Sequence, residues 1–232
     1  MVELIPKDDV SSQAFKEMLG ANFVELTPDK KSWAVVLPGF MKSTPDKFER
    51  LWRAHPDEKG RGVLFGKAVV LSRYQRAFGA DYKFFGHLEV ATAITEVSTP
   101  DVFEVKKKIR ESFSDIIEKL GFEYDACLVN WYEDGSHYIG PHSDKTNDLV
   151  EGAPIFSLSW GASRMFSFTK KKKKGIRSAP SSRVDVVLND GDLLVMGGNC
   201  QDSHKHEIRK DKKIHGRRIN MTLRCFKKDK LS

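Results

Sequence analysis

Residues 130–144, NWYEDGSHYIGPHSD, contain the pattern that decides the fold of this chain. The stretch ends in His142, Ser143 and Asp144, which place an imidazole and a carboxylate two positions apart. In an extended chain, residues i and i+2 project to the same side, so both groups could bind one metal ion. A further ligand would have to come from the later segment DSHKHEI, where His204 and His206 are the candidates.

The segment 218–226, RINMTLRCF, predicts a strand with one apolar and one polar face. In isolation it would be an ordinary surface strand with solvated arginines. Two histidines and one carboxylate, however, form the ligand set of non-haem Fe(II) oxygenases. Such enzymes commonly need a dicarboxylate cosubstrate, which arginine binds through two parallel hydrogen bonds. Asn130 and Tyr132 share a face just before the metal pair and could add neutral hydrogen bonds.

The combination of NxY, HxD, a later histidine and RxNxTxR resembles the AlkB family of Fe(II)/2-oxoglutarate dioxygenases, over about residues 37–226. The resemblance is closest to the branch that repairs alkylated bases in double-stranded DNA. That branch has its first arginine twelve residues after its metal histidine, which favours His206 over His204. The resemblance implies a metal site at His142, Asp144 and His206. It implies 2-oxoglutarate contacts at Asn130, Tyr132, Arg218, Asn220, Thr222 and Arg224.

Residues 60–90 resemble the base-recognition lid of the same branch. Alone, VLFGK at residues 63–67 would be an ordinary hydrophobic strand. In that branch a hairpin pushes its phenylalanine, here Phe65, into the base stack, where an apolar wedge offsets the cost of unstacking. Tyr82 and Phe84 share a strand face and would stack on the flipped base. The resemblance implies substrate contacts at Phe65, Gly66, Lys67, Arg73, Gln75, Tyr82, Phe84, Lys145, Thr146, Arg164, Arg209 and Lys210.

The expected fold class is α+β, with a double-stranded β-helix (jelly-roll) core, flanking N-terminal helices and the lid. We expect one oxygenase domain at residues 31–228, preceded by a loosely packed extension at residues 1–30. Helices should begin after Thr44-Pro45 and after Thr99-Pro100, and the second should end at Gly121. Core strands are expected at residues 126–132, 155–160, 165–168, 184–188 and 193–196.

Composition favours a nucleic-acid partner in a reducing compartment. The formal net charge is +7, and five consecutive lysines at residues 170–174 are candidates for phosphate contact. Three cysteines without CxxC spacing argue against a disulfide framework or a zinc site. No apolar run is long enough for a membrane helix, so we expect no membrane partner. The expected state is a monomer in the nucleus or cytoplasm, with the nucleus favoured.

One departure from the family pattern concerns the substrate. The family has acidic residues directly after HxD that accept hydrogen bonds from the damaged base, whereas this chain has Lys145 and Thr146. A lysine cannot accept a hydrogen bond, so the sequence does not identify which methylated base is the substrate. The resemblance implies oxidative removal of N-alkyl groups with Fe(II), 2-oxoglutarate and O2, releasing succinate, CO2 and formaldehyde. Alternatives are an RNA demethylase, another 2-oxoglutarate hydroxylase, or an inactive DNA-binding protein.

Overall fold

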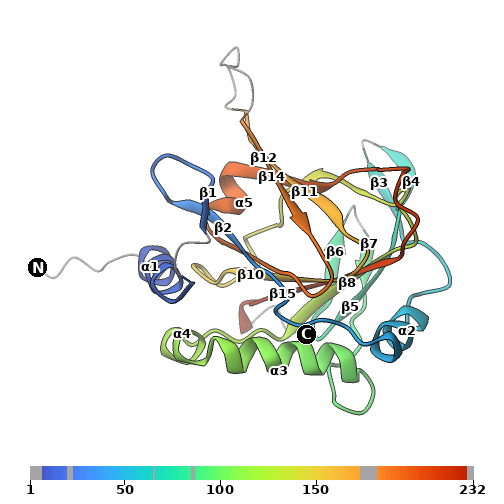
Figure 1. The fold of residues 1–232 in the computed structure, drawn as a ribbon, viewed down its shortest axis with the longest axis horizontal. Helices are drawn as coiled ribbons and strands as arrows, with labels where there is room; N and C mark the ends of the chain where they lie inside the picture. The colour runs from blue at the N-terminus through green and yellow to red at the C-terminus, as the bar shows by residue number, and fades with distance from the viewer. Residues whose placement is uncertain (1–6, 20–22, 65, 85–86, 173–181, 229–232) are drawn as a thin grey trace, which may run out of the picture.

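Two antiparallel sheets form the body of the protein, and Figure 1 shows their strands crossing the centre of the molecule. The computed structural model describes residues 7–19, 23–64, 66–84, 87–172 and 182–228. The larger sheet has the order β1 (Phe23–Glu25), β2 (Ser32–Leu37), β13 (Leu193–Gly198), β10 (Ile155–Gly161), β15 (Arg218–Arg224), β8 (Ala126–Tyr132) and β5 (Tyr74–Phe78). The smaller has the order β12 (Arg183–Leu188), β11 (Arg164–Lys170), β14 (His204–Ile208) and β9 (Ile139–His142). The predicted jelly-roll core is confirmed.

The larger sheet presents two chemically different faces. Its apolar face, which includes Trp131, Ile219 and Met221, packs against the helices α3 (Pro100–Ser112) and α4 (Ser114–Leu120), which lie below the sheet in Figure 1. A second apolar cluster, including Tyr132 and Phe168, brings together residues of both sheets. The polar residues of β8 and β15 are buried on the opposite face from Trp131 and Ile219, because alternate residues of a strand point to opposite sides. The sheet therefore positions a buried polar surface facing the smaller sheet.

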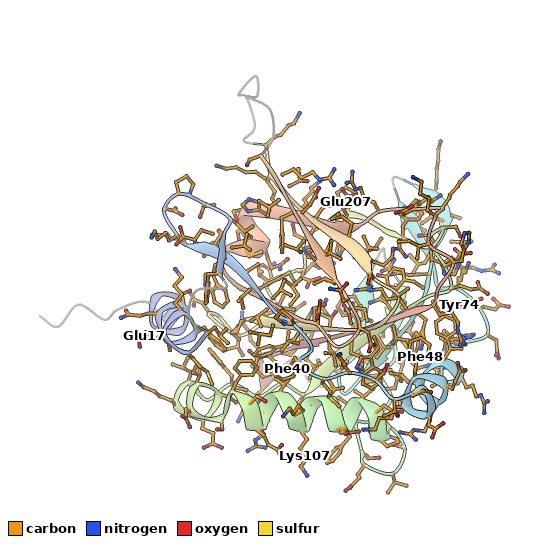
Figure 2. All side chains as sticks on the ribbon, viewed as in Figure 1. Glu17, Phe40, Phe48, Tyr74, Lys107 and Glu207 are labelled. Carbon is orange, nitrogen blue, oxygen red and sulfur yellow. The ribbon has the colours of Figure 1, made fainter. Side chains whose placement is uncertain are left out.

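The helices largely follow their sequence signals. Helix α2 (Pro45–Arg53) begins where Thr44 caps it, since the Thr44 hydroxyl accepts a 3.3 Å hydrogen bond from the backbone N–H of Lys47. The second predicted helix is divided at Phe113 into α3 and α4, and it ends at Gly121 with φ +67°. Phe113 is 2% exposed and belongs to the core. Figure 2 shows Lys107 pointing away from the sheets, on the exposed side of α3.

The expectation of a loosely packed N-terminal extension is wrong for the described part of residues 1–30. Helix α1 (Lys7–Leu19) buries Phe15 completely, with its ring centroid 5.8–6.1 Å from those of Trp33, Phe113 and Phe156. The Trp33 indole donates a 2.9 Å hydrogen bond to Ser12. A single aromatic anchor gives little periodicity in a short helix, which is why the sequence pattern did not reveal this packing.

Two small hairpins lie in the predicted lid. Strands β3 (Arg61–Leu64) and β4 (Lys67–Val70) pair with each other, as do β6 (Tyr82–Phe84) and β7 (His87–Glu89). The turn of the first hairpin has Gly66 at φ +75°, where glycine is favoured. Phe65 lies outside the described residues. One further helix, α5 (Cys200–Ser203), precedes β14. Among the described residues, no helix combines the length and apolar character needed to cross a bilayer.

We predict that Phe15→Ala lowers the free energy of unfolding by about 3–5 kcal/mol, because it leaves a cavity among aromatic rings. Urea unfolding measures this change. Met18→Ala in the same helix is the matched control, since Met18 is 46% exposed and its loss should change stability little. Equal effects of the two substitutions would show that α1 does not anchor the core through Phe15.

Candidate active site

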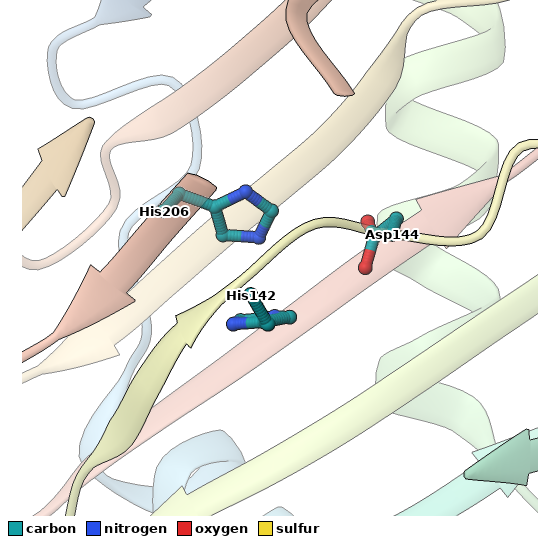
Figure 3. Close-up of side chains that lie close together, drawn as sticks. All are labelled: His142, Asp144 and His206. Carbon is teal, nitrogen blue, oxygen red and sulfur yellow. The ribbon is translucent and has the colours of Figure 1, made fainter. Parts of the chain in front are cut away.

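Three side chains, from the strands β9 and β14 and from the segment just after β9, converge on one point between the sheets. His142 ends β9, Asp144 follows it, and His206 lies opposite His142 in β14. Their candidate ligand atoms all lie within 4.8 Å of one another, and Figure 3 shows the two imidazoles and the carboxylate facing the same space. His204 is not part of this cluster, and its Nδ1 lies 2.7 Å from the Ser203 hydroxyl. The structure thus brings together the three ligands that the resemblance implied.

Asp144 has one oxygen in an ion pair and one oxygen available. Its Oδ2 accepts hydrogen bonds from Arg224 Nη2 at 2.9 Å and Nε at 3.2 Å. Its Oδ1 is buried and has no hydrogen-bond partner among the described residues. Burial is the largest single effect and would raise the pKa of Asp144. The charge of Arg224, the two neighbouring histidines and the hydrogen bond from Arg224 together outweigh burial, so the pKa is lowered. An ionised carboxylate with one free buried oxygen fits a metal ligand.

The two histidines are held in the neutral form that metal binding requires. Burial, together with the neighbouring His142, lowers the pKa of His206 to about 3. Burial also lowers the pKa of His142. His142 Nδ1 lies 2.9 Å from the carbonyl oxygen of Gly140, which makes it the N–H donor and leaves Nε2 with a free lone pair. Both imidazoles therefore suit the ligand set.

Arg218 is a buried cation with unused hydrogen-bond donors. It is 1% exposed, and its Nη2 donates a 2.9 Å hydrogen bond to the Ser159 hydroxyl. Its Nε and Nη1 have no partner within the described part of the chain. Burial lowers the pKa of Arg218 to about 10. Since buried polar groups are nearly always paired, two free donors on one guanidinium fit the carboxylate of a bound cosubstrate.

The other predicted cosubstrate residues line the same face of the sheet. Asn220 stands opposite Asn130 in the β15–β8 register, and it accepts a 3.0 Å hydrogen bond from Thr222. Its amide donates to Ser157, and Asn130 accepts a 2.6 Å hydrogen bond from Arg73. Predicted residues from β8 and β15 therefore share one polar layer.

Sequence reasoning missed three residues that support this layer: Ser157, Ser159 and Gln201. Ser157 and Ser159 alternate with buried apolar residues in β10, so the same two-residue period that revealed β15 could have found them. The Gln201 side chain accepts a 2.9 Å hydrogen bond from the backbone N–H of Asp144. Gln201 comes from the short helix α5 and no local pattern pointed to it.

A pocket opens beside the candidate metal ligands and contains part of the predicted substrate site. It is lined by Asp81, Tyr82, Asp144, Lys145, Asp148, Arg224 and Phe226. The Arg224 guanidinium carbon lies 5.3 Å from the centroid of the Tyr82 ring. The lining thus brings two predicted substrate residues, Tyr82 and Lys145, next to the ligand Asp144.

The remaining predicted substrate residues divide between the surface and the interior. Gly66, Lys67, Thr146, Arg209 and Lys210 are exposed. Arg73 and Gln75 are buried, and Arg73 donates a 3.2 Å hydrogen bond to the Gln75 side chain. The side chains of Phe65 and Phe84 lie outside the described residues. Of the lysine run, Lys171 donates to the Gln201 carbonyl, and residues 173–174 are not described.

Arg164 does not reach the surface, so its predicted role as a substrate contact is corrected. It is 1% exposed, and its guanidinium donates to the backbone carbonyls of Asp134, His137 and Arg209. A side chain with these three internal acceptors cannot reach a bound polynucleotide without giving them up.

Comparison with known proteins agrees with this geometry. The sequence profile of the 2OG-Fe(II) oxygenase superfamily matches residues 42–224. A curated relative, the alkB homolog 3 dioxygenase of Rattus norvegicus, is 33% identical over 215 residues, which are 90% of this chain and 70% of that protein. The chain belongs to this superfamily and, within it, to the AlkB family. The superfamily uses Fe(II), 2-oxoglutarate and O2, which the free Asp144 oxygen and the free Arg218 donors fit.

Other relatives extend the comparison. The human DNA oxidative demethylase ALKBH2 is 33% identical over 170 residues, 71% of this chain. The solved structure of OsALKBH1 has a TM-score of 0.52 at 24% identity, covering 82% of this chain and 97% of that one, and it supports the fold. The chain spans about 60% of the length of the human, bovine and mouse ALKBH2 proteins that it matches.

We predict that His206→Ala abolishes high-affinity Fe(II) binding, because it removes one of three ligands. His204→Ala should keep that binding, since His204 faces Ser203 and stands outside the cluster. Anaerobic calorimetric titration with Fe(II) measures both. Loss of binding in His204→Ala with retention in His206→Ala would assign the third ligand to His204.

Arg218→Met should weaken 2-oxoglutarate binding, because a desolvated charge-assisted pair is worth about 2–5 kcal/mol. The half-saturating 2-oxoglutarate concentration should rise roughly 30-fold or more. Arg217→Met is the matched control, since Arg217 pairs with Glu49 and stacks on Trp52 instead. An unchanged requirement in Arg218→Met would remove Arg218 from the cosubstrate site.

Proposed function

We propose that this protein is an oxidative demethylase that removes N-alkyl groups from damaged nucleic-acid bases, with double-stranded DNA as the favoured substrate. One observation carries the proposal. Within the described residues, the same buried layer contains a candidate metal-ligand cluster with an unpaired carboxylate oxygen at Asp144 and an arginine with two unpaired donors at Arg218. A metal ion and a dicarboxylate together account for both sets of unpaired groups.

The protein's own residues would position the reactants. His142, Asp144 and His206 would hold the iron, and Arg218 would bind a carboxylate of 2-oxoglutarate. Arg224 favours the ionised form of Asp144, and its two hydrogen bonds to Oδ2 orient the carboxylate so that Oδ1 could bind the metal. When bound, iron with 2-oxoglutarate and O2 supplies the oxidation of the N-alkyl carbon. The buried surroundings exclude water from the reacting groups.

The support for a nucleic-acid substrate comes from charge, pocket and relatives. The chain has a formal net charge of +7, and Lys67, Arg209 and Lys210 are exposed. The pocket beside Asp144 is lined by Tyr82, whose ring could stack on a base. ALKBH2 proteins, by name DNA oxidative demethylases, are among the relatives.

The hairpin β3–β4 supports the preference for duplex DNA. Val63, one residue pair from the turn, is 57% exposed, and Phe65 lies between the two strands in the sequence. Apolar side chains at the tip of a hairpin can enter a base stack and replace an extruded nucleotide. A single strand has little stacking to break, so such a wedge serves a duplex.

The proposal extends to the products and the cellular setting. Succinate, CO2 and formaldehyde would be released, and residues 31–228 would act as a monomer, with the nucleus as the favoured location. RNA demethylation is the second candidate, because exposed Lys145 and Thr146 stand where the family pattern has acidic residues. Hydroxylation of another target and DNA binding without turnover remain alternative outcomes of the test below.

The direct test is a panel of oligonucleotides, each with one methylated base, as duplex DNA, single-stranded DNA and RNA. Incubation with Fe(II), 2-oxoglutarate and O2 should lower the mass of at least one DNA duplex by one methyl group. Mass loss confined to RNA would favour the second candidate. Binding without mass change or succinate formation would contradict demethylation.

We predict that Phe65→Ala lowers demethylation of duplex DNA by at least roughly tenfold more than that of the single strand, since only the duplex needs a wedge. Val97→Ala, outside the hairpin and 93% exposed, is the control for loss of an exposed apolar group. Equal loss on both substrates, with a lower melting temperature, would instead identify Phe65 as a packing residue.

A further inference from the structure

We infer that Arg164 is a positioning residue for the 2-oxoglutarate site. Its guanidinium holds two loops in place, one between β8 and β9 and one between β14 and β15, and it fixes the ring of Tyr132. The inference rests on the proposed function, because it assumes that the polar layer binds 2-oxoglutarate. It assigns to a fully buried arginine a role that depends on hydrogen-bond geometry.

The contacts of Arg164 come from two separate loops. Its Nη1 donates to the Asp134 carbonyl at 3.1 Å, and its Nη2 donates to the carbonyls of His137 at 2.8 Å and Arg209 at 2.6 Å. Asp134 and His137 belong to the loop between β8 and β9, and Arg209 begins the loop between β14 and β15. One planar guanidinium can donate in several directions at fixed angles, which an ammonium group cannot reproduce.

The backbones of the two loops are in direct contact beside this guanidinium. The Gly135 N–H donates to the Ile214 carbonyl, and the Asp211 N–H donates to the Gly135 carbonyl, both at 2.8 Å. A Cβ atom on residue 135 would lie 1.7 Å from the Asp211 carbonyl oxygen, so only glycine permits this approach. The loops therefore form one unit, and Arg164 holds it from the β11 side.

The four strands that these two loops connect all carry residues of the proposed site. The first loop runs from Tyr132, the last residue of β8, to β9 with His142. The second loop runs from β14, with His206, to Arg218, the first residue of β15. A shift of either loop would displace a metal ligand and a cosubstrate residue together. Displacements of about 1 Å are enough to impair a preorganised site.

Arg164 also acts on Tyr132 and Arg218 through charge. Its guanidinium carbon lies 5.6 Å from the Tyr132 ring centroid, and that of Arg218 lies 5.1 Å from the same centroid. After burial, the positive charge of Arg164 is a further cause of the lowered pKa of Arg218. Two buried cations repel each other, so binding of a dianion here relieves that repulsion.

The test compares Arg164→Met and Arg164→Lys with the control Arg183→Met. Arg183 lies in β12 of the same sheet, is exposed, and pairs with Asp185. Arg164→Met removes both the charge and the donors, whereas Arg164→Lys keeps the charge and loses the planar fork. Three quantities are measured for each protein: 2-oxoglutarate affinity by anaerobic calorimetry with Fe(II), amide hydrogen exchange, and affinity for a DNA duplex.

We expect the dissociation constant for 2-oxoglutarate to rise about tenfold or more in Arg164→Met, as for other supporting residues around a site. In Arg164→Lys, amide exchange should become faster at residues 133–138 and 209–215. Duplex affinity should stay unchanged in both, because Arg164 is buried. The control should leave all three quantities unchanged.

Two results would overturn the inference while leaving the proposed function intact. The first is normal 2-oxoglutarate binding by the wild type and by folded Arg164→Lys, with unchanged exchange in both loops. The second is a loss of duplex affinity with unchanged 2-oxoglutarate binding, which would restore Arg164 as a substrate contact. Failure of the wild type itself to bind 2-oxoglutarate would contradict the proposed function, and the inference with it. If Arg164→Met does not fold, Arg164→Lys decides the question.

Discussion

The buried ion pair between Arg224 and Asp144 is the interaction on which the rest of the site depends. It joins β15 of the larger sheet to the segment that follows β9 of the smaller sheet. Burial favours the protonated form of Asp144, which cannot bind a metal ion well, and the charge of Arg224 is the largest effect that opposes burial. Because the pair uses Oδ2 alone, Oδ1 stays free for the ion.

Among the described residues, the same layer contains buried polar groups without a hydrogen-bond partner, and these weaken the fold in the absence of ligands. An unpaired buried polar group costs about 1–3 kcal/mol, and Arg218 has two such donors while Asp144 has one such acceptor. The opposite face of the sheet compensates with a dense aromatic core that includes Trp131, Trp160 and Phe156. A well-packed core on one face thus permits a surface with unpaired, ligand-ready groups on the other.

The sequence predicted those parts of the site that repeat at short intervals. Alternation in β15 placed Arg218 and Arg224 on one face, and the HxD spacing placed His142 beside Asp144, as the structure shows. Arg164 could not be assigned in this way, because its three acceptors are carbonyls from loops distant in sequence. Burial of an arginine depends on tertiary contacts that leave no local pattern. Phe15 was missed for the same reason, since its partners come from β2, β10 and the α3–α4 junction.

The central claim is that one buried layer couples oxidation of 2-oxoglutarate to removal of an N-alkyl group. The most direct measurement is the ratio of succinate formed to formaldehyde released on a methylated DNA duplex, with an unmethylated duplex of the same sequence as reference. The account predicts equal amounts of the two products on the methylated duplex and much less succinate on the reference. Succinate formation at the same rate on both duplexes, without formaldehyde, would contradict it.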